Sequence, residues 1–367
     1  MVDQPDAPIY HALAPEPANY DGPIKITANG TYSGAWQSND EQAAVIIATT
    51  EAVILENCFV RAAKWGIREG APGINLTVRD CQFRATPGGD TRAIAVASAS
   101  NLLIENNYLE GVGGMTIYSW WVESTPTQTL RVLRNRAKNI STAMSNFIQV
   151  DRVRHLKGAE IAWNEVINLP DQRSVEDNIN IHNSGGSEGS PLRIHNNIVW
   201  GAYPVPATSG TFTGTGITTD GDNTTAETAS AFVHAYENHF VGTCNAGMNI
   251  ASGHDILYEN NRLITSARLA DATALNATHA GVAIFDFYEV GSEVFYNNRI
   301  INNTIGFVSP GYNAPYQDRH DVSVHHCTGC EGNVSLPDAP ITYATEVAEH
   351  ERWQAKVKAA GLVVGPR

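Results

Sequence analysis

The feature that most constrains this fold is a column of Asn and Cys residues that recurs along most of the chain. Each is the second member of a doublet that ends a short alternating stretch: Asn57-Cys58, Asp80-Cys81, Asn106-Asn107, Arg134-Asn135, Trp163-Asn164, Asn196-Asn197, Glu237-Asn238, Asn260-Asn261, Asn297-Asn298 and His326-Cys327. Successive second members are 23, 26, 28, 29, 33, 41, 23, 37 and 29 residues apart. No spacing is shorter than 23 residues, and most are longer. This pattern indicates a solenoid with loops inserted at its corners.

The stretches before the doublets have the pattern of half-buried strands. Residues 53–58, 102–107 and 192–197 each place apolar side chains on one face and polar side chains on the other. The doublet then turns the chain. An Asn that stacks on the Asn one coil away, about 4.8 Å along the axis, can donate its side-chain amide to the next carbonyl. This arrangement satisfies polar groups that would otherwise be buried without partners at the bend.

The pattern resembles the right-handed parallel β-helix of pectate lyases and polygalacturonases over residues 24–333. The resemblance implies an all-β fold, a single-stranded right-handed parallel β-helix or solenoid of about ten coils. It also implies a carbohydrate-active protein. No pectate lyase or pectin methylesterase signature is complete in the chain. The alternative fold is a β-sandwich of many short strands, but sandwiches do not stack one residue type through successive units.

Three segments are expected. Residues 1–23 are rich in proline and predict an extended N-terminal arm, residues 24–333 form the β-helix, and residues 334–367 form a C-terminal capping segment. Apolar and aromatic residues at helical spacing in the last segment predict an amphipathic helix that ends at Gly361, with the stripe Tyr343, Val347, His350, Trp353, Val357 and Ala360. We expect this helix to cover the last coil; the alternative is a helix that binds a partner.

Charge and hydrophobicity narrow the possible partners. The formal net charge is −14, and the clustered Lys and Arg that phosphate binding needs are absent, so no nucleic-acid partner is expected. The same charge repels a polyanionic glycan unless a cation or a local Arg group intervenes. No apolar run is long enough to predict a membrane span. The polar, Pro-rich start resembles a mature terminus after removal of a signal peptide, so we expect a secreted or periplasmic protein.

The cysteines have mainly structural interpretations. Cys58, Cys81 and Cys327 stand in the column and are expected to be small buried residues. Cys58 and Cys81 on neighbouring coils could form a disulfide, as could Cys327 and Cys330. No second Cys pair or His pair at metal-ligand spacing accompanies the Cys-Thr-Gly-Cys sequence, so it does not predict a zinc site.

Each unit also contains a second strand upstream of the doublet, whose outward positions form the candidate functional face. When the apolar residues of these strands are aligned, one outward row contains Thr116, Gln149, Asn180, Thr218, Asn249 and Ala283. The next outward row contains Tyr118, Asp151, His182, Asp220, Ala251 and Phe285. Three consecutive coils are therefore expected to present Asp151, His182 and Asp220 on one exposed face, in steps of about 4.8 Å.

A carboxylate, an imidazole and a second carboxylate in register favour acid–base catalysis. Asp151 and Asp220 stand two rungs apart, which places their Cα atoms about 9.6 Å apart. Inverting glycosidases keep their two carboxyl groups about 6.5–9.5 Å apart. We therefore predict that Asp151 and Asp220 divide the acid and base roles. His182 would shift their pKa values, share a proton or bind the leaving sugar. The alternative is three solvated side chains.

Residues around this row are candidates for substrate and metal binding. The substrate-binding candidates are Tyr118, Trp120, Gln149, Arg152, Arg154, Asn180, Asn249 and His254, with Trp121 as a further aromatic side chain. Three turn acids, Glu176, Asp177 and Asp222, could form an oxygen-rich calcium site together with Asp151. Hydrolysis requires no cofactor, and Ca²⁺ is the candidate if one is used. The alternative to sugar binding by the Trp side chains is that they are buried, and the alternative to a calcium site is that the acids lie in ordinary surface turns.

Two short sequences are similar to motifs of polygalacturonase-type hydrolases. Thr-Thr-Asp-Gly at 218–221 and Ser-Gly-His-Asp at 252–255 are similar to the Asn-Thr-Asp-Gly and Gly-His-Gly motifs of that family. This resemblance implies that Asp220 is a catalytic acid and that His254 is its supporting histidine. The match departs at the first Asn and the last Gly, and the paired Asp and the later Arg-Ile-Lys of the family are missing.

Three functional classes follow from these observations. The first is a secreted enzyme that hydrolyses glycosidic bonds in a polysaccharide or oligosaccharide. The second is a calcium-assisted polysaccharide lyase that performs β-elimination on a uronate with an Arg or His base, because only Lys64, Lys138 and Lys157 are available as lysine bases in the middle of the chain. The third is a non-catalytic, adhesin-like β-helix that binds glycans without turnover.

Overall fold

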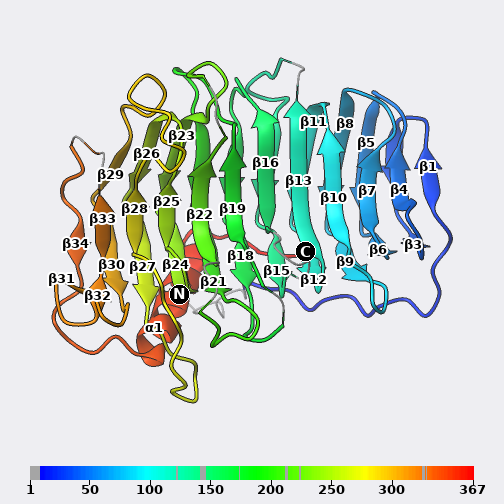
Figure 1. Ribbon diagram of the computed structural model, residues 1–367. Coiled ribbons are helices and arrows are strands. Elements are labelled where there is room, and N and C mark those ends of the chain that lie inside the picture. The colour runs from blue at the N-terminus through cyan, green and yellow to red at the C-terminus, as the bar shows by residue number, and fades with distance from the viewer. Residues whose placement is uncertain are drawn as a thin grey trace, which may run out of the picture.

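The structure is a computed structural model that describes residues 9–120, 123–140, 146–172, 174–210, 214–222, 225–324, 327 and 329–367. Three long sheets, in which every strand pair is parallel, wrap around one core (Figure 1). Consecutive strands of the chain belong to different sheets, and each strand pairs with the strand three places away in the sequence over most of the length. This arrangement is the parallel β-helix that the Asn and Cys column predicted.

Sheet 1 carries the face on which the candidate catalytic row was placed. Its strands are β1 (Ile24–Ile26), β4 (Ala43–Ile47), β7 (Trp65–Glu69), β10 (Arg92–Ala97), β13 (Gly113–Trp120), β16 (Ile148–Val153), β19 (Asp177–His182), β22 (Thr215–Asp220), β25 (Met248–Ile250), β28 (Val282–Ile284) and β33 (Val322–Val324). The longest of these strands lie in the middle of the sheet (Figure 1). The middle of sheet 1 therefore offers the broadest regular surface.

Sheets 2 and 3 complete each coil. Sheet 2 contains β2 (Gly30–Tyr32), β5 (Ala52–Glu56), β8 (Ile74–Arg79), β11 (Ala99–Glu105), β14 (Leu130–Leu133), β17 (Glu160–Ala162), β20 (Leu192–His195), β23 (Ala231–Tyr236), β26 (His254–Glu259) and β29 (Arg299–Ile301). Sheet 3 contains β3 (Ala35–Ser38), β6 (Phe59–Ala62), β9 (Gln82–Ala85), β12 (Tyr108–Glu110), β15 (Arg136–Lys138), β18 (Glu165–Ile167), β21 (Ile198–Ala202), β24 (His239–Thr243), β27 (Arg262–Thr265), β30 (Thr304–Phe307) and β34 (Val334–Ser335). A small separate sheet pairs β31 (Asn313–Ala314) with β32 (Arg319–His320).

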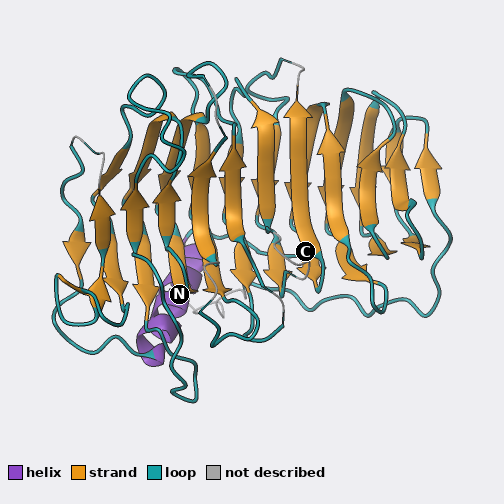
Figure 2. Cartoon of the chain, viewed as in Figure 1, coloured by secondary structure: helices purple, strands orange, loops and turns teal. Residues whose placement is uncertain are grey.

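Alternation within the strands fills the core. In β8, Ile74, Leu76 and Val78 are buried while the residues between them are partly exposed. Because strand side chains point alternately to opposite faces, every coil contributes apolar residues from all three sheets to one continuous core. Figure 2 shows the regular sequence of strands and short loops that results, interrupted by longer loops at both ends of the sheet 1 strands.

The predicted ladder runs along the corner between sheets 2 and 3. Asn107 Nδ2 donates to Asn135 Oδ1 at 2.9 Å, and the same contact links Asn135 to Asn164 at 3.0 Å. It continues through Asn197 and Asn238 to Asn261. The first residue of each doublet from Asn57 to Asn260 has a φ of 54° to 59°, a left-handed conformation that produces the turn. The ladder therefore satisfies backbone and amide groups that the corner buries.

The end of the ladder differs from the prediction. Asn261 donates to Asn303 Oδ1 and Asn303 to Asn333 Oδ1, both at 2.9 Å, so Asn298 and Cys327 are not its last members. Asn298 instead accepts a hydrogen bond from the Ile256 backbone at another corner. The error arose because two doublets, at 297–298 and 302–303, flank one three-residue strand, and only the second turns into sheet 3. His326, assigned to the last doublet, lies outside the described residues.

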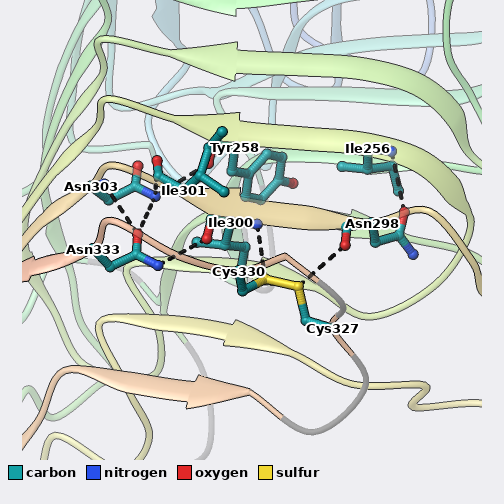
Figure 3. The surroundings of a disulfide bond; sticks show 9 residues. All are labelled: Ile256, Tyr258, Asn298, Ile300, Ile301, Asn303, Cys327, Cys330 and Asn333. Atoms are coloured by element: carbon teal, nitrogen blue, oxygen red, sulfur yellow. Dashed lines mark hydrogen bonds between the residues drawn. A yellow bond between two sulfur atoms is a disulfide. The ribbon is translucent and has the colours of Figure 1, made fainter.

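One of the two disulfides considered is present. Cys327 and Cys330 are bonded, whereas Cys58 and Cys81 are free thiols in the ladder, where the Cys58 amide lies 3.4 Å from Cys81 Sγ. The Ile300 backbone N–H donates to Cys330 Sγ at 3.1 Å, and Figure 3 shows the disulfide beside this last strand of sheet 2. The bonded pair therefore covers the end of the core at the position where sheet 2 has no further strand.

The C-terminal helix does not occupy the predicted position. Helix α1 (Tyr343–Ala359) contacts β21, β24 and β27 on the outer side of sheet 3, so the expectation that it covers the last coil is wrong. Its buried face includes Trp353 and Val357 but also Glu346 and Glu349. Glu349 accepts hydrogen bonds at 2.6 and 3.0 Å from Arg262 of β27. The apolar stripe omitted these acids, whose polar partners on sheet 3 hold the helix at the side.

Both ends of the described chain lie along sheet 3. The side chain of Gln82 donates to the Ala14 carbonyl of the N-terminal arm, and the Val364 amide donates to the Ile9 carbonyl. Figure 1 shows this arm running below the strands toward α1. No helix of the described chain packs on sheet 1. No helix in these residues has the length and apolar character that crossing a membrane would require.

Candidate active site

The predicted row of acid, histidine and acid forms in register on sheet 1. Asp151 of β16 pairs with His182 of β19, and His182 pairs with Asp220 of β22. The neighbouring residues Val150 and Ile181 are fully buried, whereas the three residues of the row are partly exposed. The row therefore faces away from the core, as the alternation of apolar residues predicted. Figure 1 shows these three strands side by side in the middle of the sheet.

His182 and Asp151 form a hydrogen-bonded pair. Nδ1 of His182 lies 2.8 Å from Asp151 Oδ1, while Nε2 has no hydrogen-bond partner among the described residues. The hydrogen bond to Asp151 is the main cause that raises the pKa of His182, and the charges of Asp220 and Asp222 act in the same direction against the opposing effect of burial. A carboxylate that holds one imidazole nitrogen fixes the ring and leaves the other nitrogen available for proton transfer.

Asp220 belongs to a second hydrogen-bonded pair. Its Oδ1 accepts hydrogen bonds from the Tyr288 hydroxyl at 2.9 Å and from the Gly221 amide at 2.8 Å. Burial and the nearby negative charge of Asp220 raise the pKa of Tyr288, so the phenol keeps its proton at neutral pH. Sequence reasoning missed Tyr288, because it lies 68 residues beyond Asp220 in an irregular loop without a repeat pattern.

Two arginines follow Asp151 on the same strand and the turn after it. The Arg152 side chain is 56% exposed, and its Nε lies 3.4 Å from Asp151 Oδ1. Arg154 is half-buried, and its Nε donates to the Asn183 carbonyl at 2.8 Å. The structure thus places the positive group that an acidic sugar would need directly beside the row.

A groove of about 260 Å³ adjoins Asp220 on sheet 1. Its lining residues are Glu176, Asp177, Thr215, Thr218, Asp220, Asn245, Asn249, Ala251, Phe285, Phe287 and Tyr288. Asn249 therefore lies beside the row, as expected for a substrate-binding residue. Burial raises the pKa of Glu176, and the charges of Asp177 and Asp220 raise it further. The groove combines carboxyl groups with aromatic rings, which suits a sugar chain.

The predicted calcium ligands have other contacts. The Asp177 side chain is buried; its Oδ1 accepts hydrogen bonds from Thr215 and Thr218, and its Oδ2 accepts one from Asn180 at 2.8 Å. Asp222 Oδ1 instead accepts from Asn183 at 2.7 Å. Within the described ranges, no three His, Cys, Asp or Glu side chains converge in a way that could hold a metal ion. The calcium site at Glu176, Asp177 and Asp222 stays a prediction without support from this arrangement.

Two of the predicted substrate-binding residues have buried side chains, so their predicted role has no support from the structure. Trp120 is 3% exposed and belongs to the hydrophobic core, so its ring cannot stack on a sugar. Asn180 is 4% exposed and donates to Asp177. Of the remaining candidates, Gln149 is partly exposed in the row next to Asp151, and the Tyr118 hydroxyl contacts Arg68 at 3.1 Å. Trp121 lies outside the described residues.

His254 does not support Asp220 in the way the motif implied. It begins β26 of sheet 2, and its Nδ1 and Nε2 lie 2.6 Å from Asp255 Oδ2 and 2.9 Å from the Ala226 carbonyl. Both nitrogens are therefore occupied away from the row. His254 lines a separate cavity together with Arg154, at the corner where sheet 1 turns into sheet 2.

Comparisons with known proteins give distant structural similarities. No family model matches the chain, and no curated protein matches it. One similar solved structure is a mannuronic acid specific polysaccharide family 6 lyase from human gut microbiota, with a TM-score of 0.41, 13% identity, and coverage of 94% of this chain and 91% of that chain. Another is the A-module of the Azotobacter vinelandii mannuronan C-5 epimerase AlgE6, with a TM-score of 0.38, 11% identity, and coverage of 85% and 92%. Likeness at this level does not assign an activity.

Proposed function

We propose that this protein is a polysaccharide lyase that cleaves a uronate-containing polysaccharide by β-elimination, with His182 as the base. The observation that carries the proposal is the hydrogen bond from His182 Nδ1 to Asp151, 2.8 Å long, which leaves Nε2 without a partner among the described residues. A neutral imidazole held in this tautomer can accept a proton at Nε2 from a substrate on the outer face of sheet 1.

The neighbouring side chains fit the steps of an elimination. His182 takes the proton from C5 of the uronate, the electron pair forms the C4–C5 double bond, and the bond from C4 to the leaving oxygen breaks. Arg152, which is 56% exposed, stabilises the charge that develops on the uronate carboxylate. The Tyr288 hydroxyl, which donates to Asp220 at 2.9 Å, protonates the leaving oxygen. Arg152 also offsets the repulsion between an acidic substrate and the net charge of −14.

Hydrolysis is the second candidate, and one observation favours it. Glu176 lies in the groove beside Asp220, and burial together with neighbouring acids raises its pKa, as general acids of glycosidases require. The pair first predicted for this role, Asp151 and Asp220, fits less well. His182 stands on the rung between them and is hydrogen-bonded to Asp151, so the gap for a catalytic water is occupied.

A location outside the cytoplasm is part of the same proposal. Cys327 and Cys330 form a disulfide at the end of the core, and such bonds persist in oxidising compartments. A polysaccharide substrate would be found in the same places. Detection of the protein in the culture medium or periplasm of its source cells tests this point, and confinement to the cytosol would contradict it.

The test of the activity is a panel of uronate-containing and neutral polysaccharides, with and without a chelator. Elimination produces an unsaturated uronate at the new non-reducing end, which absorbs in the ultraviolet, whereas hydrolysis produces only new reducing ends. We expect unsaturated products from at least one uronate polymer. His182→Gln should lower turnover by about 10²–10⁴-fold, the usual contribution of a general base. A matched control is His234→Gln, because His234 lies 2.8 Å from Glu259 on sheet 2, away from the row.

The outcomes separate the functional classes. Reducing ends without unsaturation, lost in Glu176→Gln but not in His182→Gln, would replace elimination by hydrolysis. Binding of polymers without any product would indicate a glycan-binding protein. Full turnover by His182→Gln would remove the proposed base. Loss of activity with a chelator would restore the calcium prediction.

A further inference from the structure

A second cavity lies beside the catalytic row, at the corner between sheets 1 and 2. It has a volume of about 280 Å³, and its lining includes Arg154, Gly185, Glu227, Phe232, His254 and Tyr296. Gly185 lets the chain pack closely there, because a Cβ at this position would stand 1.7 Å from the Ala231 carbonyl oxygen. The elimination proposed for the row uses none of these residues.

Aromatic side chains form one wall of this cavity. His254 is 6% exposed, and its two nitrogens are fixed by Asp255 and by the Ala226 carbonyl. Tyr296 stacks on the His254 ring with a centroid distance of 4.6 Å and an interplanar angle of 9°, yet it remains 39% exposed. Phe232 meets the same histidine edge-on at 5.7 Å. A rigid, exposed aromatic face of this kind is a platform for the apolar face of a sugar ring.

Arg154 supplies the polar side of the cavity. Only Nε of its three guanidinium nitrogens has a hydrogen-bond partner among the described residues, the Asn183 carbonyl. Its two terminal nitrogens are therefore available as paired donors, the geometry that matches a carboxylate. Arg154 is half-buried, so its charge is less screened than that of a surface arginine. Glu227, the acid in the lining, is exposed on the rim, where solvent weakens its opposing effect.

We propose that this cavity is a second sugar subsite that binds one uronate ring of the substrate, stacked on Tyr296 with its carboxylate on Arg154. The inference rests on the proposed function, because it deepens the assignment of a uronate polymer. Arg154 follows Asp151 by three residues, and the chain turns at Arg152, whose φ is 53°. The two Cα atoms are therefore at most about 10 Å apart, so a sugar in the cavity lies within reach of a chain on the row. The volume is just below the usual range of drug-sized ligand sites, as expected for a single ring.

The test measures binding of single sugars, which cannot be cleaved, to the intact protein. The probes are glucuronate, galacturonate and mannuronate, with glucose, galactose and mannose as their neutral counterparts. Binding of each probe is measured by saturation-transfer NMR titration. We expect at least one uronate to bind at least tenfold more tightly than its neutral counterpart. Arg154→Gln should remove this preference, and Tyr296→Ala should weaken binding at least tenfold. Arg154→Lys keeps the charge without the paired donors and should retain part of the preference.

Tyr312→Ala is the matched control. Tyr312 is 42% exposed and stacks on His320 at 4.1 Å with an angle of 10°, but it lies at another cavity. Its replacement should leave binding unchanged. Uronate binding that survives both Arg154→Gln and Tyr296→Ala would overturn the proposal, as would equal binding of acidic and neutral sugars or no binding of either.

These outcomes are distinct from failure of the proposed lyase activity. If the proposed subsite is correct and elimination is not, single uronates still bind through Arg154 and Tyr296 while polymers give no unsaturated product. If elimination is correct and the subsite is not, unsaturated products appear while both variants bind uronates as the parent protein does.

Discussion

Two carboxylate–histidine pairs link the same two coils of this solenoid and differ in what surrounds them. On sheet 1, Asp151 of β16 holds His182 of β19 at 2.8 Å. On sheet 2, Glu160 of β17 holds Nε2 of His195 of β20 at 2.7 Å. The His182 ring has a free Nε2 within the described chain, whereas His195 Nδ1 also contacts the Asn196 amide at 2.8 Å and the ring stacks on Tyr236.

The difference shows that the pair alone does not make a reactive site. His195 has no nitrogen left for a substrate, and its ring is packed against a neighbour, so its role is structural. His182 has one nitrogen fixed and one open on a face without a covering helix. The second nitrogen therefore decides which histidine can transfer a proton.

The largest effect is expected from removing the charge that orients His182. In Asp151→Asn, the amide can donate to Nδ1 and so place the imidazole proton on Nε2, the wrong tautomer for a base. Turnover should fall by about 10²–10⁴-fold. Glu160→Gln makes the same change in the other pair and should leave turnover per folded molecule unaltered. Equal losses in steady-state assays of the two variants would erase the functional distinction between the pairs.

A smaller loss of activity is expected at the far end of the row. Tyr288→Phe removes the hydroxyl that donates to Asp220 and, in the proposed reaction, protonates the leaving oxygen. We expect kcat to fall by about 10²-fold, at the low end for a proton donor, because water can enter in its place. KM should change little. An unchanged kcat would assign proton donation to another group, such as protonated His182.

Replacing a residue of the Glu160–His195 pair should lower the free energy of unfolding. His195→Gln removes the hydrogen bond to half-buried Glu160, which keeps its contact with Arg193 at 3.2 Å, and the stack on Tyr236. It should lower the free energy of unfolding by about 1 kcal/mol, the usual net contribution of one hydrogen bond. His182→Gln lies on an open face and should cost less. Urea unfolding of the two variants measures the difference. A greater loss of stability in His182→Gln would indicate that the row has a structural role after all.

The smallest expected effects are on the pH dependence of kcat/KM and of the free energy of unfolding. The pKa of His182 is raised, chiefly by its hydrogen bond to Asp151, so more alkaline pH is needed to form the neutral base than for an ordinary histidine. We therefore expect kcat/KM to rise with pH through that raised pKa. Asp151→Asn should move this limb to lower pH. The raised pKa also affects the free energy of unfolding. The His182–Asp151 pair stabilises the folded protein fully at pH values below the pKa of His182 in the unfolded chain. This contribution is lost as pH rises through the pKa of His182 in the folded protein.

The pKa of Glu160 is lowered, chiefly by its hydrogen bond with His195, so its contribution to stability has the opposite dependence. The stabilising contribution of Glu160 is fully present above the pKa of this residue in the unfolded chain. It is lost as pH falls through the pKa of Glu160 in the folded protein. Unfolding free energies of Asp151→Asn and Glu160→Gln, each measured against the parent protein from acid to alkaline pH, should therefore diverge in opposite directions. Parallel curves would contradict the assigned shifts.

The sequence contained the repeat and the register but not the irregular contacts. Period-two alternation determines which strand residues point outward, so the row of Asp151, His182 and Asp220 could be derived without coordinates. The same rule does not distinguish an open outward position from a covered one. Asn180 was correctly placed outward but is 4% exposed under its neighbours.

Residues contributed by loops were beyond the reach of repeat analysis. Tyr288 and Tyr296 both lie between β28 and β29, where no alternation or ladder fixes the chain. The position of α1 was also missed, because its buried stripe includes Glu346 and Glu349, which an analysis of apolar spacing excludes. Their partners lie 80 residues or more away in the sequence, at Ser266 for Glu346 and at Arg262 for Glu349.

The two terminal segments of the described chain run along sheet 3, on the side of the solenoid away from the row. Ile9 and Val364 are hydrogen-bonded to each other there, and Arg367 is paired with Asp80 farther along the same side. A bead tethered through Arg367 would therefore sit behind the solenoid. The open face of sheet 1, with the row of Asp151, His182 and Asp220, would then point away from the bead, an orientation suited to immobilised use.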